Sequence, residues 1–67
     1  MENYYHEACN WVEAEAFHEA AFMRSMAIGD AVNANVHFQS LKRLRSKMTG
    51  FVTEVTWARE YLASKAK

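Results

Sequence analysis

The residues from Ala34 to Leu62 carry an unbroken heptad pattern, and this pattern limits the chain to a helical fold. Alternating steps of three and four residues fall on Ala34, His37, Leu41, Leu44, Met48, Phe51, Val55, Ala58 and Leu62. Eight of these nine positions are apolar, which is typical of a helix packed along its length against other helices. We therefore expect one helix over about residues 31–64. Gly50 is a possible kink, or a break that splits the segment into two helices, because glycine in a helix interior costs about 1 kcal/mol relative to alanine. The heptad phase, which continues across Gly50 without a skip, favours one helix.

A second helix is predicted over about residues 3–27, where alanine is abundant and neither proline nor glycine occurs. Its expected inward face again follows steps of three and four residues, through Tyr5, Cys9, Val12, Ala16, Glu19, Met23 and Met26. Gly29 is suited to end this helix and Asp30 to cap the next one. So short a link forces two consecutive helices to run antiparallel. The sequence thus predicts an all-α fold: a single helical-hairpin domain over residues 1–67.

The net charge is zero, but the charges are divided between the two predicted helices. The first 30 residues hold six acidic residues and one basic residue, whereas the rest hold seven basic residues and two acidic ones. Opposite charges on antiparallel helices favour ion pairs between them. The expected neighbours across the hairpin are Arg43 for Glu15, Arg45 for Glu13, and Gln39 and Lys42 for Glu19.

A chain of 67 residues has a small core, and this one cannot close a disulfide because Cys9 is its only cysteine. The longer second helix would extend past the first and leave aromatic residues without cover. We therefore expect a homodimer that forms a four-helix bundle. The expected dimer or partner interface comprises Tyr4, Tyr5, Trp11, Phe51, Val55, Trp57, Tyr61 and Leu62. The lone thiol and the lack of a long apolar run or signal peptide predict a cytoplasmic protein with no membrane partner.

The segment from Lys42 to Lys47 carries the strongest signal for nucleic-acid binding. Lys42, Arg43, Arg45 and Lys47 place four basic side chains within six residues of a helix, and such clusters neutralise phosphates. The other interpretation is that these side chains pair with the glutamates of the first helix. The zero net charge favours the second interpretation.

Few residues point to catalysis or to a cofactor. Glu15 and His18 form a Glu-x-x-His pattern, which supplies metal ligands in some helical bundles, but the second helix offers no obvious inward glutamate at the same level. His37 is either a ligand or pH switch, or a hydrogen-bonded core histidine, and the second interpretation is favoured. His6 is expected to face solvent, and Cys9 to be a structural thiol. With no phosphate-cradling loop and no nucleophile triad, we expect no cofactor and no enzymatic activity.

The opening sequence, Met1 to Trp11 (MENYYHEACNW), followed by a helical body, resembles small early-region proteins of lambdoid bacteriophages. These proteins are encoded between the exonuclease and excisionase genes. The resemblance implies an accessory factor of lysis–lysogeny development or host takeover, which binds a host or phage protein in the bacterial cytoplasm. It supplies no functional residues. Two functions follow: a small non-catalytic interaction or regulatory protein, and alternatively a dimeric hairpin that binds nucleic acid.

Overall fold

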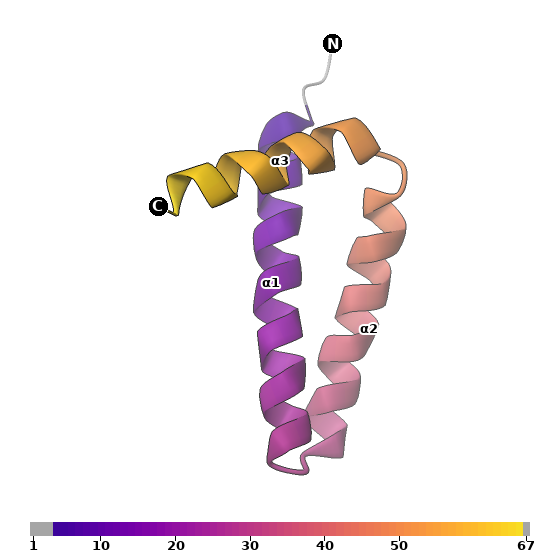
Figure 1. Ribbon diagram of the computed structural model, residues 1–67. Helices are drawn as coiled ribbons and strands as arrows, with labels where there is room; N and C mark the ends of the chain where they lie inside the picture. Colours follow the sequence, from indigo (N-terminus) through magenta and orange to yellow (C-terminus); the bar gives the residue numbers. More distant parts are fainter. Residues whose placement is uncertain (1–3, 67) are drawn as a thin grey trace.

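The computed structural model describes residues 4–66, which form three helices and no strand. Helix α1 spans Tyr5–Ala27, α2 spans Ala31–Met48 and α3 spans Val52–Lys65. Helices α1 and α2 run antiparallel as a hairpin, and α3 folds back across the N-terminal end of α1 (Figure 1). The all-α prediction is confirmed. The predicted first helical residue, Asn3, and the end of the 1–67 domain at Lys67 lie outside the described residues.

The first turn forms as the sequence predicts. Gly29 has a φ of 76°, a left-handed conformation that glycine adopts without steric cost. The amide of Asp30 donates to the carbonyl of Ser25 at 2.8 Å, and the amide of Gly29 donates to the carbonyl of Met26 at 3.2 Å. This pair of bonds is a Schellman motif, which satisfies carbonyls at the end of α1. Asp30 then caps α2 by accepting a hydrogen bond from the amide of Asn33.

The prediction of one long second helix is wrong, because the chain turns at residues 49–51. The amides of Gly50 and Phe51 bond to carbonyls three residues back, and Phe51 has a φ of −136° and a ψ of 47°, outside the helical region. The Thr49 hydroxyl also donates to the carbonyl of Ser46 at 2.6 Å. Gly50 is therefore a break between two helices and not a kink within one. The chain is a three-helix unit and not a two-helix hairpin.

The heptad pattern nevertheless identifies the inward face on both sides of this break. All nine of its residues from Ala34 to Leu62 are buried or half-buried, and Val55 and Ala58 are only 7% and 0% exposed. The heptad face continues into α3 because α3 packs this face against α1. In one straight helix, the same face would have extended past α1 without cover. The predicted straight extension beyond Val55 is wrong, because α3 packs Val55 and Ala58 against α1 and only its C-terminal turns project past α1 (Figure 1).

The predicted inward face of α1 is correct only near its start. Cys9 and Val12 are half-buried and pack against the core, but Ala16, Glu19, Met23 and Met26 are exposed. The residues of α1 that are buried are Ala8, Glu15, Ala21 and Ser25. Polar and small side chains line this face, so an apolar pattern does not reveal it.

The core is built mainly from small side chains. Ala8, Met48, Val55 and Ala58 form its centre where the three helices meet, with Trp11, Leu44 and Phe51 among the half-buried residues around it. Between α1 and α2, Ala21, Ala34 and Leu41 fill the seam. No large side chain of residues 4–66 is completely buried. None of the three helices has the length and apolar character needed to span a bilayer.

Candidate functional site

The aromatic residues predicted for an interface gather where α3 crosses α1. Tyr4 and Trp11 each contact the ring of Phe51, with centroids 4.6 Å and 5.1 Å away. These three side chains are half-buried, as is Leu62, and Val55 is buried in the core. Tertiary packing within one chain therefore covers much of this set.

Three aromatic residues at this crossing stay at the surface. The ring of Trp57 meets Tyr5 edge-on at 5.1 Å and stacks on Tyr61 at 5.0 Å with the ring planes 8° apart. Tyr5, Trp57 and Tyr61 are 38%, 41% and 42% exposed, and we call them the aromatic row. The amino group of Lys65 lies 5.3 Å from the ring centre of Tyr61 at one end. Two of the eight predicted interface residues thus lie exposed on α3 and one on α1.

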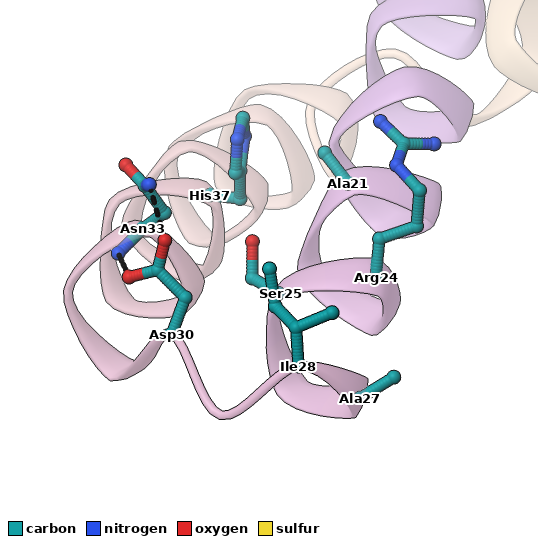
Figure 2. A pocket seen from close by; sticks show the side chains of 8 residues that line it. All are labelled: Ala21, Arg24, Ser25, Ala27, Ile28, Asp30, Asn33 and His37. Carbon is teal, nitrogen blue, oxygen red and sulfur yellow. Dashed lines mark hydrogen bonds between the residues drawn. The ribbon is translucent and has the colours of Figure 1, made fainter.

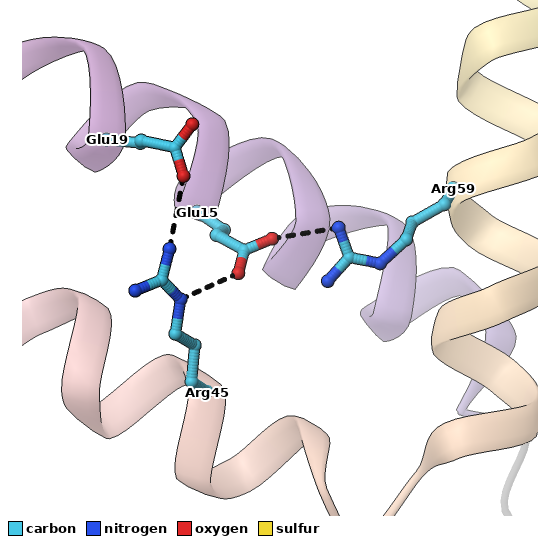
Figure 3. A network of polar contacts seen from close by, with 4 residues as sticks. All are labelled: Glu15, Glu19, Arg45 and Arg59. Carbon is cyan, nitrogen blue, oxygen red and sulfur yellow. Dashed lines mark hydrogen bonds and ion pairs between the residues drawn. The ribbon is translucent and has the colours of Figure 1, made fainter.

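A polar network holds the three helices together through Glu15 (Figure 3). Its two carboxylate oxygens accept from Arg45 of α2 and Arg59 of α3, each at 3.1 Å. Arg45 also contacts Glu19 at 3.1 Å. The Glu15 side chain is 11% exposed, whereas both arginines are about half exposed, at 51% and 52%. The predicted pairings of Glu15 with Arg43 and of Glu13 with Arg45 are wrong. The partner of Glu15 is Arg45, two residues or about half a helical turn beyond Arg43. Arg59 was not predicted because it reaches Glu15 only after the chain turns at residues 49–51 and α3 crosses α1 (Figure 1).

The four basic residues of α2 are all exposed, but they do not form one cationic patch. Arg45 is neutralised in the Glu15 network. The amino groups of Lys42 and Lys47 lie over the rings of Phe38 and Trp11, each 5.7 Å from the ring centre. Within residues 4–66, Arg43 alone of the four has neither an acidic nor an aromatic partner.

The Glu-x-x-His pattern does not assemble a multi-carboxylate metal centre. The carboxylate of Glu15 is occupied by two arginines, and the described part of the chain holds no group of three or more potential metal ligands from His, Cys, Asp and Glu. His18 instead meets His37 across the hairpin, with their Nδ1 atoms 2.9 Å apart. His6 is exposed as predicted, and Cys9 is half-buried against the core.

A pocket of about 540 Å³ opens beside His37 near the hairpin turn. Arg24, Ser25, Asp30 and Asn33 supply its polar lining, and Figure 2 shows these side chains around His37. The amide of Asn33 donates to the carboxylate of Asp30 and its side chain donates a second bond at 2.6 Å. These two hydrogen bonds lower the pKa of Asp30.

A shallow apolar groove of about 280 Å³ lies at the same end of the hairpin and was not predicted. Phe22 and Met26 of α1 line it together with Ala31, Ala34, Asn35 and Phe38 of α2. Met26 and Phe38 are 60% and 42% exposed. The sequence pattern predicts that Met26 lies on the inward face of α1. Met26 is instead exposed, so this part of the prediction is wrong.

Known proteins give no direct guide to these surfaces. The chain matches no protein-family model, no curated protein and no solved structure in the comparisons.

Proposed function

We propose that this chain is a small non-catalytic interaction protein that self-associates as a homodimer through its aromatic row. The observation that carries this proposal is the stacked and exposed set of Tyr5, Trp57 and Tyr61. Tyrosine and tryptophan are enriched among the side chains that dominate binding energy at protein interfaces. The regulatory role implied by the resemblance to phage early proteins, exerted by contact with a host or phage protein, belongs to the same proposal.

The small apolar core supports self-association with a second copy of the chain. The buried apolar residues are four alanines together with Leu41, Met48 and Val55. A core of this size supplies few kilocalories per mole of net stability, and small domains often compensate by association. A second copy of the chain supplies this additional stability by association, and it is always available because both copies are made together.

Size-exclusion chromatography with light scattering, over a range of micromolar concentrations, tests the proposal. We expect the wild-type chain to have twice its monomer mass of 7.7 kDa. The double variant Trp57→Ala/Tyr61→Ala should have the monomer mass, and circular dichroism should show that it keeps its helices. Met26→Ala, at the opposite end of the hairpin, is the matched control and should remain dimeric. A monomeric wild-type chain, or a Met26→Ala variant that alone dissociates, would refute the aromatic row as the dimer contact.

Binding of nucleic acid is the second candidate, favoured by the exposure of all four basic side chains of α2. Their dispersal among aromatic and acidic partners makes it the weaker one, because phosphate binding would first have to release Arg45 from Glu15 and Glu19. An electrophoretic mobility shift of RNA and DNA at low salt tests it. Retardation that Arg43→Ala abolishes would replace the interaction proposal with this one.

A further inference from the structure

His18 of α1 and His37 of α2 face each other across the hairpin through their Nδ1 atoms. The Nδ1 atoms of His18 and His37 are 2.9 Å apart, the ring centres are 5.1 Å apart, and the ring planes differ by 43°. The contact joins residues 19 positions apart in sequence. For two neutral imidazoles this contact needs one ring to carry its proton on Nδ1 and the other to carry its proton on Nε2. A metal ion bound by both Nδ1 atoms would instead need the same tautomer in both rings, with the proton on Nε2.

We propose that His18 and His37 form a two-histidine chelate for a divalent late transition metal ion such as Ni²⁺ or Cu²⁺. Imidazole nitrogen bonds these ions at about 2.0–2.1 Å, and both ions favour square-planar or tetragonal geometry. Two ligands at right angles around such an ion lie roughly 2.9 Å apart, which matches the separation of the two Nδ1 atoms. A tetrahedral Zn²⁺ site would need about 3.3 Å between them, so we expect weaker binding of Zn²⁺.

The surroundings leave room for the remaining ligands of the ion. Both histidines are half-buried, and the 540 Å³ pocket opens beside His37. Water can therefore complete the coordination shell, since the described residues supply no third His, Cys, Asp or Glu to this pair. Phe17 packs edge-on against both rings, with centroids 5.3 Å and 6.2 Å away. Because the ligands belong to different helices, bound metal would tie α1 to α2.

Titration of the untagged protein with Ni²⁺ tests this site, and Ni²⁺ avoids the oxidation of Cys9 that Cu²⁺ would cause. Isothermal titration calorimetry should show one ion per chain. At a free Ni²⁺ concentration of about one hundred times Kd, the melting temperature should rise by roughly 10 °C or more. His18→Asn and His37→Asn should each weaken binding at least tenfold. His6→Asn removes the exposed third histidine and should bind as the wild type does.

Nuclear magnetic resonance of the wild-type chain keeps the test independent of whether the variants fold. Paramagnetic Ni²⁺ at substoichiometric amounts should broaden the ring signals of His18 and His37 before those of His6. The proposal is overturned if Ni²⁺ at millimolar concentration neither binds nor raises the melting temperature. It is equally overturned if His6 broadens first, or if both His18→Asn and His37→Asn retain wild-type affinity. None of these readouts depends on self-association through the aromatic row.

Discussion

The Glu15 network offers the sharpest test of how α3 is held, and Glu15→Gln is the appropriate change. Glutamine keeps the size of the side chain and one acceptor oxygen, but removes the charge that Arg45 and Arg59 share. Exposed ion pairs contribute about 0.2–1 kcal/mol, whereas breaking a fully buried pair costs about 3–5 kcal/mol. Here the carboxylate is 11% exposed but each arginine is about half exposed, so the arginines regain water when the pair is lost.

We therefore place each pair near the upper limit for exposed pairs, at about 1 kcal/mol. Arg45 keeps Glu19 as a partner in the variant, and glutamine still accepts one hydrogen bond. The net loss should be about 1–2 kcal/mol, which corresponds to a fall in melting temperature of roughly 5–15 °C for a domain of this size. Glu13→Gln, an exposed position on the same helix, is the matched control and should change stability by less than about 0.5 kcal/mol.

Urea unfolding followed by circular dichroism, at one fixed protein concentration, measures these changes. A double-mutant cycle of Glu15→Gln with Arg59→Ala isolates the pair that joins α1 to α3, and its coupling energy should be about 1 kcal/mol. A coupling below about 0.3 kcal/mol would mean that the contact is solvated and that apolar packing alone docks α3. A Glu15→Gln variant as stable as the wild type would refute the argument altogether.

Further predictions concern the turns and the core. Gly29→Ala should destabilise the chain by about 1–2 kcal/mol because its φ of 76° disfavours a Cβ, whereas Gly50→Ala should be tolerated, since its Cβ would meet only the Lys47 carbonyl at 3.6 Å; thermal melts compare the two. The pKa of Asp30 is lower in the fold than in the unfolded chain, so its cap should stabilise α2 above about pH 4 and lose this effect as the pH falls through the folded pKa. Asp30→Ala should abolish that part of the acid-side loss in a pH series of urea unfolding, and an unchanged acid limb would contradict this. Ala58→Leu should cost about 1–3 kcal/mol by overpacking a site that is 0% exposed, and a stabilised variant would show that the α1–α3 contact has spare volume.

The sequence predicts the faces of α2 and α3 well but not their path. Every heptad position from Ala34 to Leu62 is buried or half-buried, because side-chain periodicity reports which side of a helix faces the core. Periodicity carries no information about whether the helix axis turns, and the continuous phase across Gly50 therefore favoured one straight helix. The turn is stabilised by tertiary contacts, since the α3 that crosses α1 buries Val55 and Ala58 and brings Arg59 to Glu15 (Figure 1).

The polar contacts between the helices were harder to predict than the helix faces, because their partners are distant in sequence. The inward face of α1 contains Glu15, His18 and Ser25, which an apolar pattern assigns to solvent. Their burial or half-burial depends on partners that are distant in sequence, such as Arg59 for Glu15 and His37 for His18. The aromatic residues were recognised from their type alone, but the rationale that they lacked cover was wrong for Trp11 and Phe51, which are half-buried against the core.

The placement of α3 has a consequence for how the fold opens. Helix α3 packs chiefly on α1 and has few contacts with α2, near Met48 and the connecting residues 49–51. Its departure leaves the α1–α2 seam of Ala21, Ala34 and Leu41 intact. Partial opening of a protein proceeds through such cooperative units, and units with few buried contacts open at the lowest free energy. Amide hydrogens of α3 should therefore exchange with solvent before those of the hairpin, and a released α3 could dock on the α1 of another chain, which makes this helix the element suited to domain swapping.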